Sequence, residues 1–433
     1  MNQLLRPGQV VHTKSGTGEC SVEQFLGGGG QGEVYRVRMG EDCFALKWYN
    51  SASATSQQRE ALLRLIQKGS PSDRFLWPLE LMHSAAAGSF GYLMPLRPEG
   101  YHRVDAMMTR RIEPGFRAVT TACFELAGSF LQLHAQGLCY RDISFGNIFL
   151  EPNNGTILIC DNDNVEEDGK AIPGIAGTPR FMAPEVVRGE ALPSSKSDLF
   201  SLAVLLFYML MMHHPLEGER EQAIRCLDAP AMAQLYGKNP IFIFDPTDER
   251  NRPMPGTQDN ALVFWRLYPE FIRKLFIRAF TAGIRDPDNG RVRESEWRAA
   301  MVQLRDSISY CACGSELFIE GATTGIRCWA CGRQAPTPLV LKVGRAQVAL
   351  NHDTLLFPHH TSRDQTYDFT VPTARVTRHP TRTDRWGLQN LTNGNWVATL
   401  KDGGQLTIEP QRGVVLRVGT RIQFGQVTAE ICG

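Results

Sequence analysis

A glycine-rich segment at residues 26–34, Leu-Gly-Gly-Gly-Gly-Gln-Gly-Glu-Val, could bind phosphate groups, because glycine amides can approach phosphate oxygens closely. A P-loop would need Lys and then Ser or Thr at the end of this motif, but Glu33 follows Gly32. A dinucleotide-binding fingerprint would need a helix after the glycines, whereas residues 34–38 alternate like a strand. We therefore interpret the segment as the turn of a hairpin, with Lys47 on the next strand-like run. A flexible turn beside a surface lysine is the alternative.

Four of the eleven cysteines have the spacing of metal ligands. Cys311-x-Cys313 and Cys328-x-x-Cys331 are separated by 14 residues, and four thiolates on two turns can close a tetrahedron around Zn²⁺. Because four protein ligands leave no open position, the metal would be structural. Rubredoxin-like iron and two disulfides are the alternatives. The other seven cysteines are isolated, which indicates a reducing compartment and disfavours disulfides.

The composition is that of an ordinary soluble protein with room for several hydrophobic cores. The chain has 433 residues, of which 42% are hydrophobic and 21% charged, and its formal net charge is +1. Residues 1–16 have no apolar core of the signal-peptide type, and the longest mainly apolar run, 199–212, is shorter than the ~20 residues that span a bilayer. We therefore expect a cytoplasmic protein that binds neither nucleic acid nor membrane.

The elements that must position these residues change in type along the chain. Strand-like stretches come first, and helical patterns follow at 56–68, 116–136, 197–212, 219–227, 269–282 and 294–304. From Leu339 onward, apolar and polar residues alternate and Asn393-Gly394 marks a turn, which predicts an all-β region. Pro336 and Pro338 mark the linker before it.

Four further segments follow Lys47 in a fixed order. They are Tyr-Arg-Asp-Ile-Ser-Phe-Gly-Asn at 140–147, Asp-Asn-Asp at 161–163, Gly-Thr-Pro-Arg-Phe-Met-Ala-Pro-Glu at 177–185 and Ser-Asp-Leu-Phe at 197–200. With the glycine-rich segment and Lys47, they make residues 15–306 resemble a eukaryotic-type (Hanks-type) Ser/Thr protein kinase. The resemblance implies an α+β fold with two lobes, the N-lobe at about 1–96 and the C-lobe at about 97–308.

The resemblance also implies a role for each matching residue, with ATP and Mg²⁺ as cofactors. Asp142 would accept the proton of a substrate hydroxyl, and Asn147 and Asp161 would hold Mg²⁺. Lys47 would hold the α- and β-phosphates, with Glu60 as its orienting partner. The residues expected to contact ATP are Leu26, Gly27, Gly28, Gly29, Gly30, Gln31, Gly32, Val34, Ala45, Lys47, Met94 and Leu96.

Structural roles follow from the same resemblance. Glu185 is expected to pair with Arg291. Asp198 is expected to brace the backbone of residues 140–147, which correspond to the catalytic loop of the family. The Ala-Pro-Glu segment at 183–185 suits protein substrates and therefore disfavours a small-molecule phosphotransferase.

Two departures from the family pattern bear on activity. Ser144 stands where these kinases usually carry a lysine that contacts the transferring phosphate, and the loss of one such donor raises a barrier by roughly 3 kcal/mol. Asn162-Asp163 replaces Phe-Gly, so regulation by a flip of this loop is not expected. The residues assigned to chemistry are all present, and we expect an active kinase; a nucleotide-binding pseudokinase scaffold is the alternative.

Two smaller modules are predicted after the kinase domain at 1–308. Residues 309–335 form the zinc ribbon, and residues 339–433 a β-sandwich. Trp-Gly-Leu-Gln-Asn-Leu at 386–391 and Arg-Ile-Gln-Phe-Gly at 421–425 resemble strands of a forkhead-associated (FHA) domain, which implies a phosphopeptide ligand. The alternative is a generic partner-binding sandwich.

The order of the three modules resembles that of bacterial kinases associated with tellurite-resistance-type operons. That resemblance implies a protein substrate, a von Willebrand A-type protein as the partner and a counteracting phosphatase.

Overall fold

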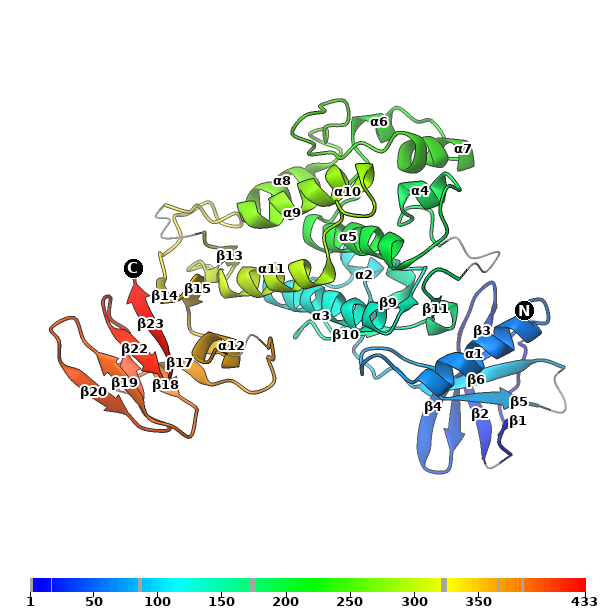
Figure 1. Cartoon of the computed structure of the whole chain (residues 1–433), viewed down its shortest axis with the longest axis horizontal. Coiled ribbons are helices and arrows are strands. Elements are labelled where there is room, and N and C mark those ends of the chain that lie inside the picture. Colours follow the sequence, from blue (N-terminus) through cyan, green and yellow to red (C-terminus); the bar gives the residue numbers. More distant parts are fainter. Residues whose placement is uncertain are drawn as a thin grey trace. The chain divides into compact units, whose positions relative to one another are not determined.

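The structure is a computed structural model that describes residues 3–16, 18–84, 88–170, 177–320, 325–363, 366–379, 381–382 and 385–433 (Figure 1). The chain divides into two units, the first comprising residues 1–114, 121–262 and 275–298 and the second comprising residues 115–120, 263–274 and 299–433. The second unit thus takes in pieces of the predicted C-lobe. The domain boundaries at residues 308 and 339 stay predictions.

Six antiparallel strands of the first unit close into a barrel in the order β1-β2-β3-β4-β6-β5 (Figure 1). They are β1 (Val10–Thr13), β2 (Glu19–Gly28), β3 (Gly32–Met39), β4 (Asp42–Tyr49), β5 (Glu80–His83) and β6 (Phe90–Pro95). Alternate side chains of each strand point inward, so Tyr35 of β3 and Trp48 of β4 share one buried cluster. The pairing of Val34 with Lys47 places the lysine directly across from the end of the glycine-rich hairpin.

Helix α1 (Ser56–Lys68) has the predicted bounds and packs against the barrel (Figure 1). Its N-terminus is capped by Thr55, whose side-chain oxygen accepts a hydrogen bond from the backbone N–H of Gln58 at 3.1 Å. Leu62 and Leu65 are buried on the inner face of the helix. The orientation of this face decides which polar residues of α1 lie near the barrel.

The rest of the first unit is mainly helical. The helices between residues 100 and 306 are α2 (Asp105–Met108), α3 (Phe116–Ala135), α4 (Pro184–Val187), α5 (Ser195–Met211), α6 (Glu219–Gln222), α7 (Ala229–Met232), a π-helix (Ala233–Lys238), α8 (Asp259–Leu267), α9 (Glu270–Phe280), α10 (Ala282–Arg285) and α11 (Glu294–Asp306). Some of them contribute to both units. No described helix has the length and apolar character needed to cross a membrane.

One predicted helix is shorter than expected. The pattern at 219–227 predicted a continuous helix, but α6 ends at Gln222. The side chains of residues 223–228 are exposed or only partly buried. A short helix depends on a buried apolar face for its stability, and this segment lacks one.

Two short sheets hold the loops between the barrel and the large helices. β7 (His102–Arg103), β9 (Ile148–Leu150) and β10 (Ile157–Ile159) form one, and β8 (Leu138–Cys139) and β11 (Glu166–Glu167) form the other. Ile148 pairs with Ile159, and the backbone N–H of Cys160 donates to the Asn147 carbonyl at 2.9 Å. This register brings Asn147 beside the residue that precedes Asp161.

The second unit contains a short hairpin and a β-sandwich, in agreement with the alternating pattern after Leu339. The hairpin consists of β12 (Ile308–Tyr310) and β13 (Glu316–Phe318). One sheet of the sandwich contains β15 (Ala346–Leu350), β14 (Leu339–Val343), β23 (Val427–Cys432), β22 (Arg421–Phe424), β19 (Trp396–Thr399) and β20 (Gln405–Ile408). The other contains β16 (Leu355–Leu356), β17 (Ala374–Arg378), β18 (Trp386–Asn390) and β21 (Gly413–Val415). A single helical turn, α12 (Pro358–Thr361), interrupts the all-β pattern.

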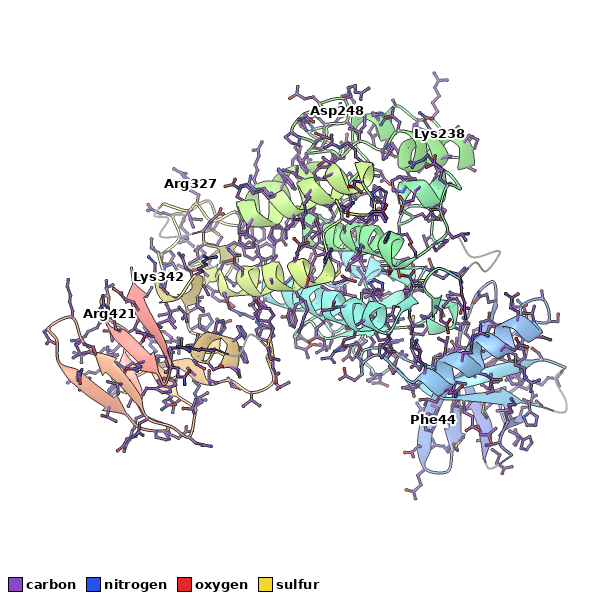
Figure 2. All side chains as sticks on the ribbon, viewed as in Figure 1. Phe44, Lys238, Asp248, Arg327, Lys342 and Arg421 are labelled. Atoms are coloured by element: carbon purple, nitrogen blue, oxygen red, sulfur yellow. The ribbon has the colours of Figure 1, made fainter. Side chains whose placement is uncertain are left out.

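The two faces of the larger sheet differ in polarity because side chains alternate along each strand. Leu341 of β14 and Ile422 of β22 are fully buried in the core of the sandwich. Their neighbours Lys342 and Arg421 are exposed (Figure 2). Burial alternates along β19 and β22, as the sequence pattern predicted, whereas β15 has three consecutive buried residues at its end.

Candidate active site

The glycine-rich turn joins β2 to β3, and its glycines have two different roles. The backbone N–H of Gly29 donates to the Gly32 carbonyl at 2.9 Å. A Cβ atom at Gly32 would lie 2.1 Å from the Trp48 carbonyl oxygen, so strand packing requires glycine there. A Cβ atom at Gly27, Gly29 or Gly30 would meet no atom within 4 Å. Packing does not require glycine at these three positions, and the open space beside them suits the close approach of a ligand.

Four of the apolar residues expected to contact ATP come together. Val34, Ala45, Met94 and Leu96 belong to one hydrophobic cluster with Leu158. The β4–β6 register causes this, because Ala45 pairs with Met94 at the end of the barrel where the chain leaves for the helical region. The cluster offers an apolar surface of the kind that receives a flat heterocycle. Leu26, also expected at the nucleotide, is partly exposed on β2.

Lys47 is buried and contacts two carboxylates. Its Nζ atom lies 2.8 Å from Asp163 Oδ2 and 3.3 Å from Asp161 Oδ1, and it donates to Gln31 Oε1 at 3.1 Å. Burial alone would lower the pKa of Lys47, but the attraction of Asp163 and Asp161 outweighs burial and raises this pKa above its ordinary value. Lys47 is therefore a permanently charged group at the centre of the site.

The two carboxylates differ in their surroundings. Burial, reinforced by the neighbouring charge of Asp163, raises the pKa of Asp161, and Lys47 opposes this rise. Burial would also raise the pKa of Asp163, but Lys47 and the hydrogen bonds around the carboxylate lower it. The Asp161 side chain is 42% exposed and the Asp163 side chain 0%.

The structure does not bring Glu60 to Lys47, which differs from the predicted pairing. Glu60 is exposed. Gln58 lies on the buried face of α1, because it precedes Ala61 by three residues and Leu62 by four. The Gln58 amide donates to the Asp163 carbonyl oxygen at 3.1 Å. The helical pattern alone did not show which face of α1 points toward the site.

The carboxylate of Asp142 is oriented by hydrogen bonds to both of its oxygens. Oδ1 accepts bonds from the Thr178 backbone N–H at 3.0 Å and the Thr178 hydroxyl at 2.7 Å. Oδ2 accepts a bond from Asn147 Nδ2 at 3.1 Å, and the same nitrogen donates to the Asp142 carbonyl at 2.8 Å. Asp142 is therefore held as a hydrogen-bond acceptor, which suits a general base.

Asp161 has a backbone conformation that is uncommon for a residue other than glycine. Its φ of 54° and ψ of 40° lie in the left-handed region, which aspartate tolerates better than most residues. The next residue, Asn162, is fully buried, and its amide nitrogen donates to the Leu76 and Ile159 carbonyls at 2.9 and 3.0 Å. These two bonds hold the turn in place.

Asp198 braces the backbone of the catalytic loop, as expected. Its carboxylate accepts hydrogen bonds from the backbone N–H groups of Tyr140 and Arg141. His134 lies between Asp198, at 3.2 Å, and Glu294. Burial disfavours the charged imidazole, but hydrogen bonds to these two carboxylates outweigh burial and raise the pKa of His134 to about 9.

A second ion pair joins distant parts of the first unit. Arg291 Nη2 lies 2.6 Å from Glu185 Oε1, which is the predicted pairing. The side chain of Arg291 is buried and that of Glu185 nearly so. The pair ties the segment that ends at Glu185 to the chain ahead of α11.

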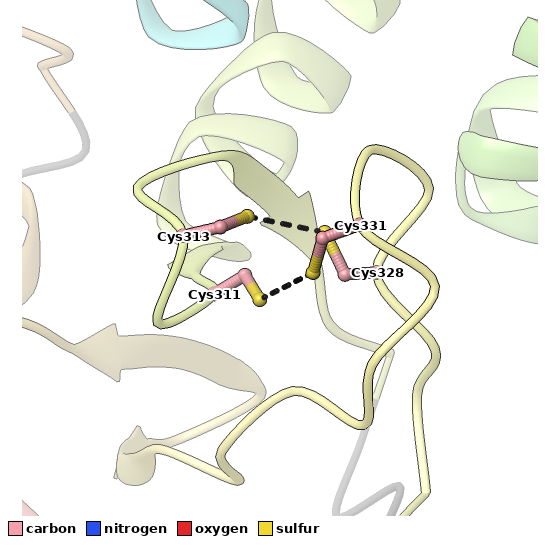
Figure 3. Close-up of side chains that lie close together, drawn as sticks. All are labelled: Cys311, Cys313, Cys328 and Cys331. Atoms are coloured by element: carbon pink, nitrogen blue, oxygen red, sulfur yellow. Dashed lines mark hydrogen bonds between the residues drawn. The ribbon is translucent and has the colours of Figure 1, made fainter.

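The four clustered cysteines converge in the second unit (Figure 3). The Cys311 and Cys331 sulfurs are 3.7 Å apart, as are those of Cys313 and Cys328, and all four lie within 4.8 Å of one another. Four sulfurs at ~2.3 Å from a central Zn²⁺ would be about 3.8 Å apart in a tetrahedron, whereas a disulfide needs ~2.05 Å. The spacing therefore fits a metal ion and not a pair of disulfides.

The turns that carry the cysteines each contain a glycine with a positive φ angle. Gly314 and Gly332, which follow the second cysteine of each pair, have φ values of 89° and 70°. Backbone N–H groups on both turns donate back to a cysteine carbonyl, from Gly314 to Cys311 and from Gly332 to Cys328. Such turns aim two thiolates toward one point.

Residues 20–254 match the family model of the protein kinase domain, which covers more than half of the chain. The chain therefore belongs to the protein kinase family. It is 26% identical over 191 residues to protein kinase gsk3 of Schizosaccharomyces pombe, an alignment that covers 41% of this chain and 46% of that protein. It is 23% identical over 313 residues to protein kinase YegI of Escherichia coli K12, covering 68% and 46%. The chain thus spans about half the length of these relatives.

The glycines of the hairpin give a first prediction. Gly29→Ala should change the free energy of unfolding by less than about 0.5 kcal/mol, because its methyl group meets open space, but should weaken Mg–ATP binding. Gly32→Ala should destabilise the protein by about 1–3 kcal/mol, because its methyl group would overlap the Trp48 carbonyl. Urea unfolding and calorimetric titration with Mg–ATP measure both quantities. Equal destabilisation by the two variants would contradict the distinction.

His134 gives a second prediction, on pH. Because its pKa is raised from 6.5 to about 9, the folded protein holds a proton that the unfolded chain releases between these values. The stabilisation is complete below pH 6.5 and is lost as the pH rises through 9, a total on the order of 3 kcal/mol. Urea unfolding across this range should show the loss in the wild type and a flatter profile in His134→Gln. Parallel profiles would contradict the assignment.

Proposed function

We propose that this protein is an ATP- and Mg²⁺-dependent Ser/Thr protein kinase that transfers the γ-phosphate of ATP to a hydroxyl group of a partner protein. The observation that carries the proposal is the Asp142 carboxylate, oriented by Thr178 and Asn147. The glycine-rich hairpin, the buried Lys47 and the partly exposed carboxylate of Asp161 accompany it in the same unit.

The donor set fits a nucleotide and a hard cation. Asn147 and Asp161 offer oxygen ligands of the kind that Mg²⁺ prefers. The Asp161 side chain is exposed enough for one of its carboxylate oxygens to contact an ion. When bound, the ion would offset negative charge on the phosphates. Lys47 would add its ammonium to the α- and β-phosphates, and the amides of the glycine-rich turn would approach the same groups.

In the proposed transfer the protein forms no covalent bond to the phosphoryl group; it positions the reactants and stabilises charge. The substrate hydroxyl oxygen bonds to the γ-phosphorus while the bond from that phosphorus to the β,γ-bridging oxygen breaks, and ADP leaves. The hydroxyl proton passes to Asp142. Ser144 is a buried residue of the loop at 140–147, and it supplies no positive charge where a lysine is usual. We therefore expect slow turnover.

We propose further that the second unit recruits or regulates the partner. Two packed sheets support an FHA-like sandwich, and from Leu339 onward 11 Lys and Arg residues against 7 Asp and Glu residues give it a net charge of +4. A phosphorylated or acidic segment suits such a surface. A von Willebrand A-type partner and an opposing phosphatase remain expectations from the resemblance to tellurite-resistance-associated bacterial kinases.

Phosphoryl transfer tests the main proposal. The wild type incubated with γ-labelled ATP, Mg²⁺ and acceptor proteins should label itself or an acceptor. Asp142→Ala and Lys47→Ala should lower the rate by roughly 10²–10⁴-fold. Asp73→Ala, which alters a carboxylate whose side chain is 83% exposed, serves as the matched control and should retain activity. Nucleotide binding without any transfer by the wild type would favour the scaffold alternative.

We also propose that Cys311, Cys313, Cys328 and Cys331 hold a structural Zn²⁺. Their small buried core offers little hydrophobic stabilisation, so metal binding would stabilise the segment by on the order of 10 kcal/mol at neutral pH. The ion would lack an open position for substrate.

Metal removal tests this site. Elemental analysis should find one zinc per chain, and a strong chelator should lower the melting temperature of the protein. Cys313→Ser should lose the zinc and the chelator response together. The control is Cys226→Ser, which alters an exposed cysteine far from the cluster in sequence and should keep both. Retention of zinc by Cys313→Ser, or a metal-free wild type, would contradict the proposal.

A further inference from the structure

The carboxylate of Asp163 is enclosed by donors from two strands of the barrel. The Lys47 ammonium donates to Oδ1 at 3.0 Å and to Oδ2 at 2.8 Å. The Tyr92 hydroxyl donates to Oδ1 at 3.2 Å, and the Tyr49 hydroxyl donates to Oδ2. Asp163 lies in a short 3₁₀ turn after β10 (Asn162–Asn164). Both of its oxygens are thus occupied by protein groups.

This enclosure fits a fixed ion pair and not a metal ligand. A buried carboxylate is tolerated only where a positive charge and further hydrogen bonds satisfy it, and Lys47 with the two tyrosines meets that requirement. Asp161 differs, because its side chain is 42% exposed and its contact with Lys47 is longer, at 3.3 Å. Of the two carboxylates, only Asp161 has room to contact an ion.

The same turn also anchors helix α1. Gln58 of α1 donates to the Asp163 carbonyl oxygen at 3.1 Å and to the Tyr49 hydroxyl at 3.2 Å. Glu60 of that helix is exposed. The helix therefore contacts the network through a neutral amide and contributes no charge to Lys47.

We propose that Asp163 is the residue that positions Lys47 for phosphate binding, in the place of a carboxylate on helix α1. The inference rests on the proposed kinase function. Lys47 is then held by the loop that also carries Asp161, so a movement of α1 would not remove its charged partner. The site is assembled without a switch in this helix.

Steady-state kinetics of two matched amide substitutions test the proposal. Asp163→Asn should lower kcat/KM for ATP by about 100-fold, because the ammonium loses its fixed position. Glu60→Gln should stay within about twofold of the wild type. A large loss in Glu60→Gln, or an unchanged Asp163→Asn, would overturn the proposal.

A double-mutant cycle separates positioning from direct catalysis. If Asp163 acts through Lys47, Lys47→Ala/Asp163→Asn should be as active as Lys47→Ala within about twofold. Additive losses would mean that Asp163 acts on its own, for example as a metal ligand, and would overturn the proposal.

A milder variant keeps the test valid if Asp163→Asn fails to fold. Tyr92→Phe removes one donor to Asp163 and changes no charge, and melting curves report whether each variant is folded. It should lower kcat/KM by about 3- to 10-fold in the wild type and have no effect in the Lys47→Ala background. An equal effect in both backgrounds would count against the proposal.

Binding measurements distinguish failure of this inference from failure of the kinase proposal. If the wild type transfers no phosphate, the kinase proposal fails, and Mg–ATP affinity still reports on Lys47. A weaker affinity in Asp163→Asn but not in Glu60→Gln would support the positioning role. The same affinity in all three proteins would overturn it.

Discussion

The buried ion pair of Lys47 and Asp163 is the contact on which the arrangement of the active site depends. An ammonium and a carboxylate that are both removed from water are stable only when they meet each other with their remaining hydrogen-bonding capacity satisfied. Here Gln31 accepts a hydrogen bond from Lys47, and two tyrosine hydroxyls donate hydrogen bonds to Asp163. The pair joins β4 to the turn after β10, and this turn also carries Asp161. One contact therefore sets the distance between Lys47 and Asp161.

Strand register fixes the position of the catalytic loop relative to Asp161. The β9–β10 hairpin pairs Ile148 with Ile159, so Asn147 and Asp161 leave the same end of the hairpin although 13 residues separate them. Asn147 then reaches Asp142, and Asp198 fixes the backbone just before that residue. The geometry of the base thus comes from a short sheet and one buried carboxylate, and not from the loop alone.

Much of this was predictable from sequence, because the chemistry restricts both residue type and order. The glycine-rich turn and the cysteine turns follow local rules of spacing, whereas the apolar residues expected to contact ATP follow from the family resemblance. The structure brings the cysteines together, and it also gathers these apolar residues in one cluster. The partner of Lys47 was not predictable in this way. A helical pattern shows that Glu60 is on a helix, but tertiary packing decides which face points inward. The sequence likewise showed no sign that Tyr49 and Tyr92 contact the carboxylate of Asp163, because these residues lie far from it along the chain.

Asn162 and Asp163, which stand where the family pattern has Phe-Gly, therefore make hydrogen bonds that the side chains of phenylalanine and glycine could not make. Asn162 is pinned by two backbone carbonyls, and Asp163 by a lysine. Turning this segment over would break those bonds and leave two buried charges without partners, which is costly in a protein interior. The turn is consequently a fixed support. We therefore expect any control of this site to act elsewhere than on this turn.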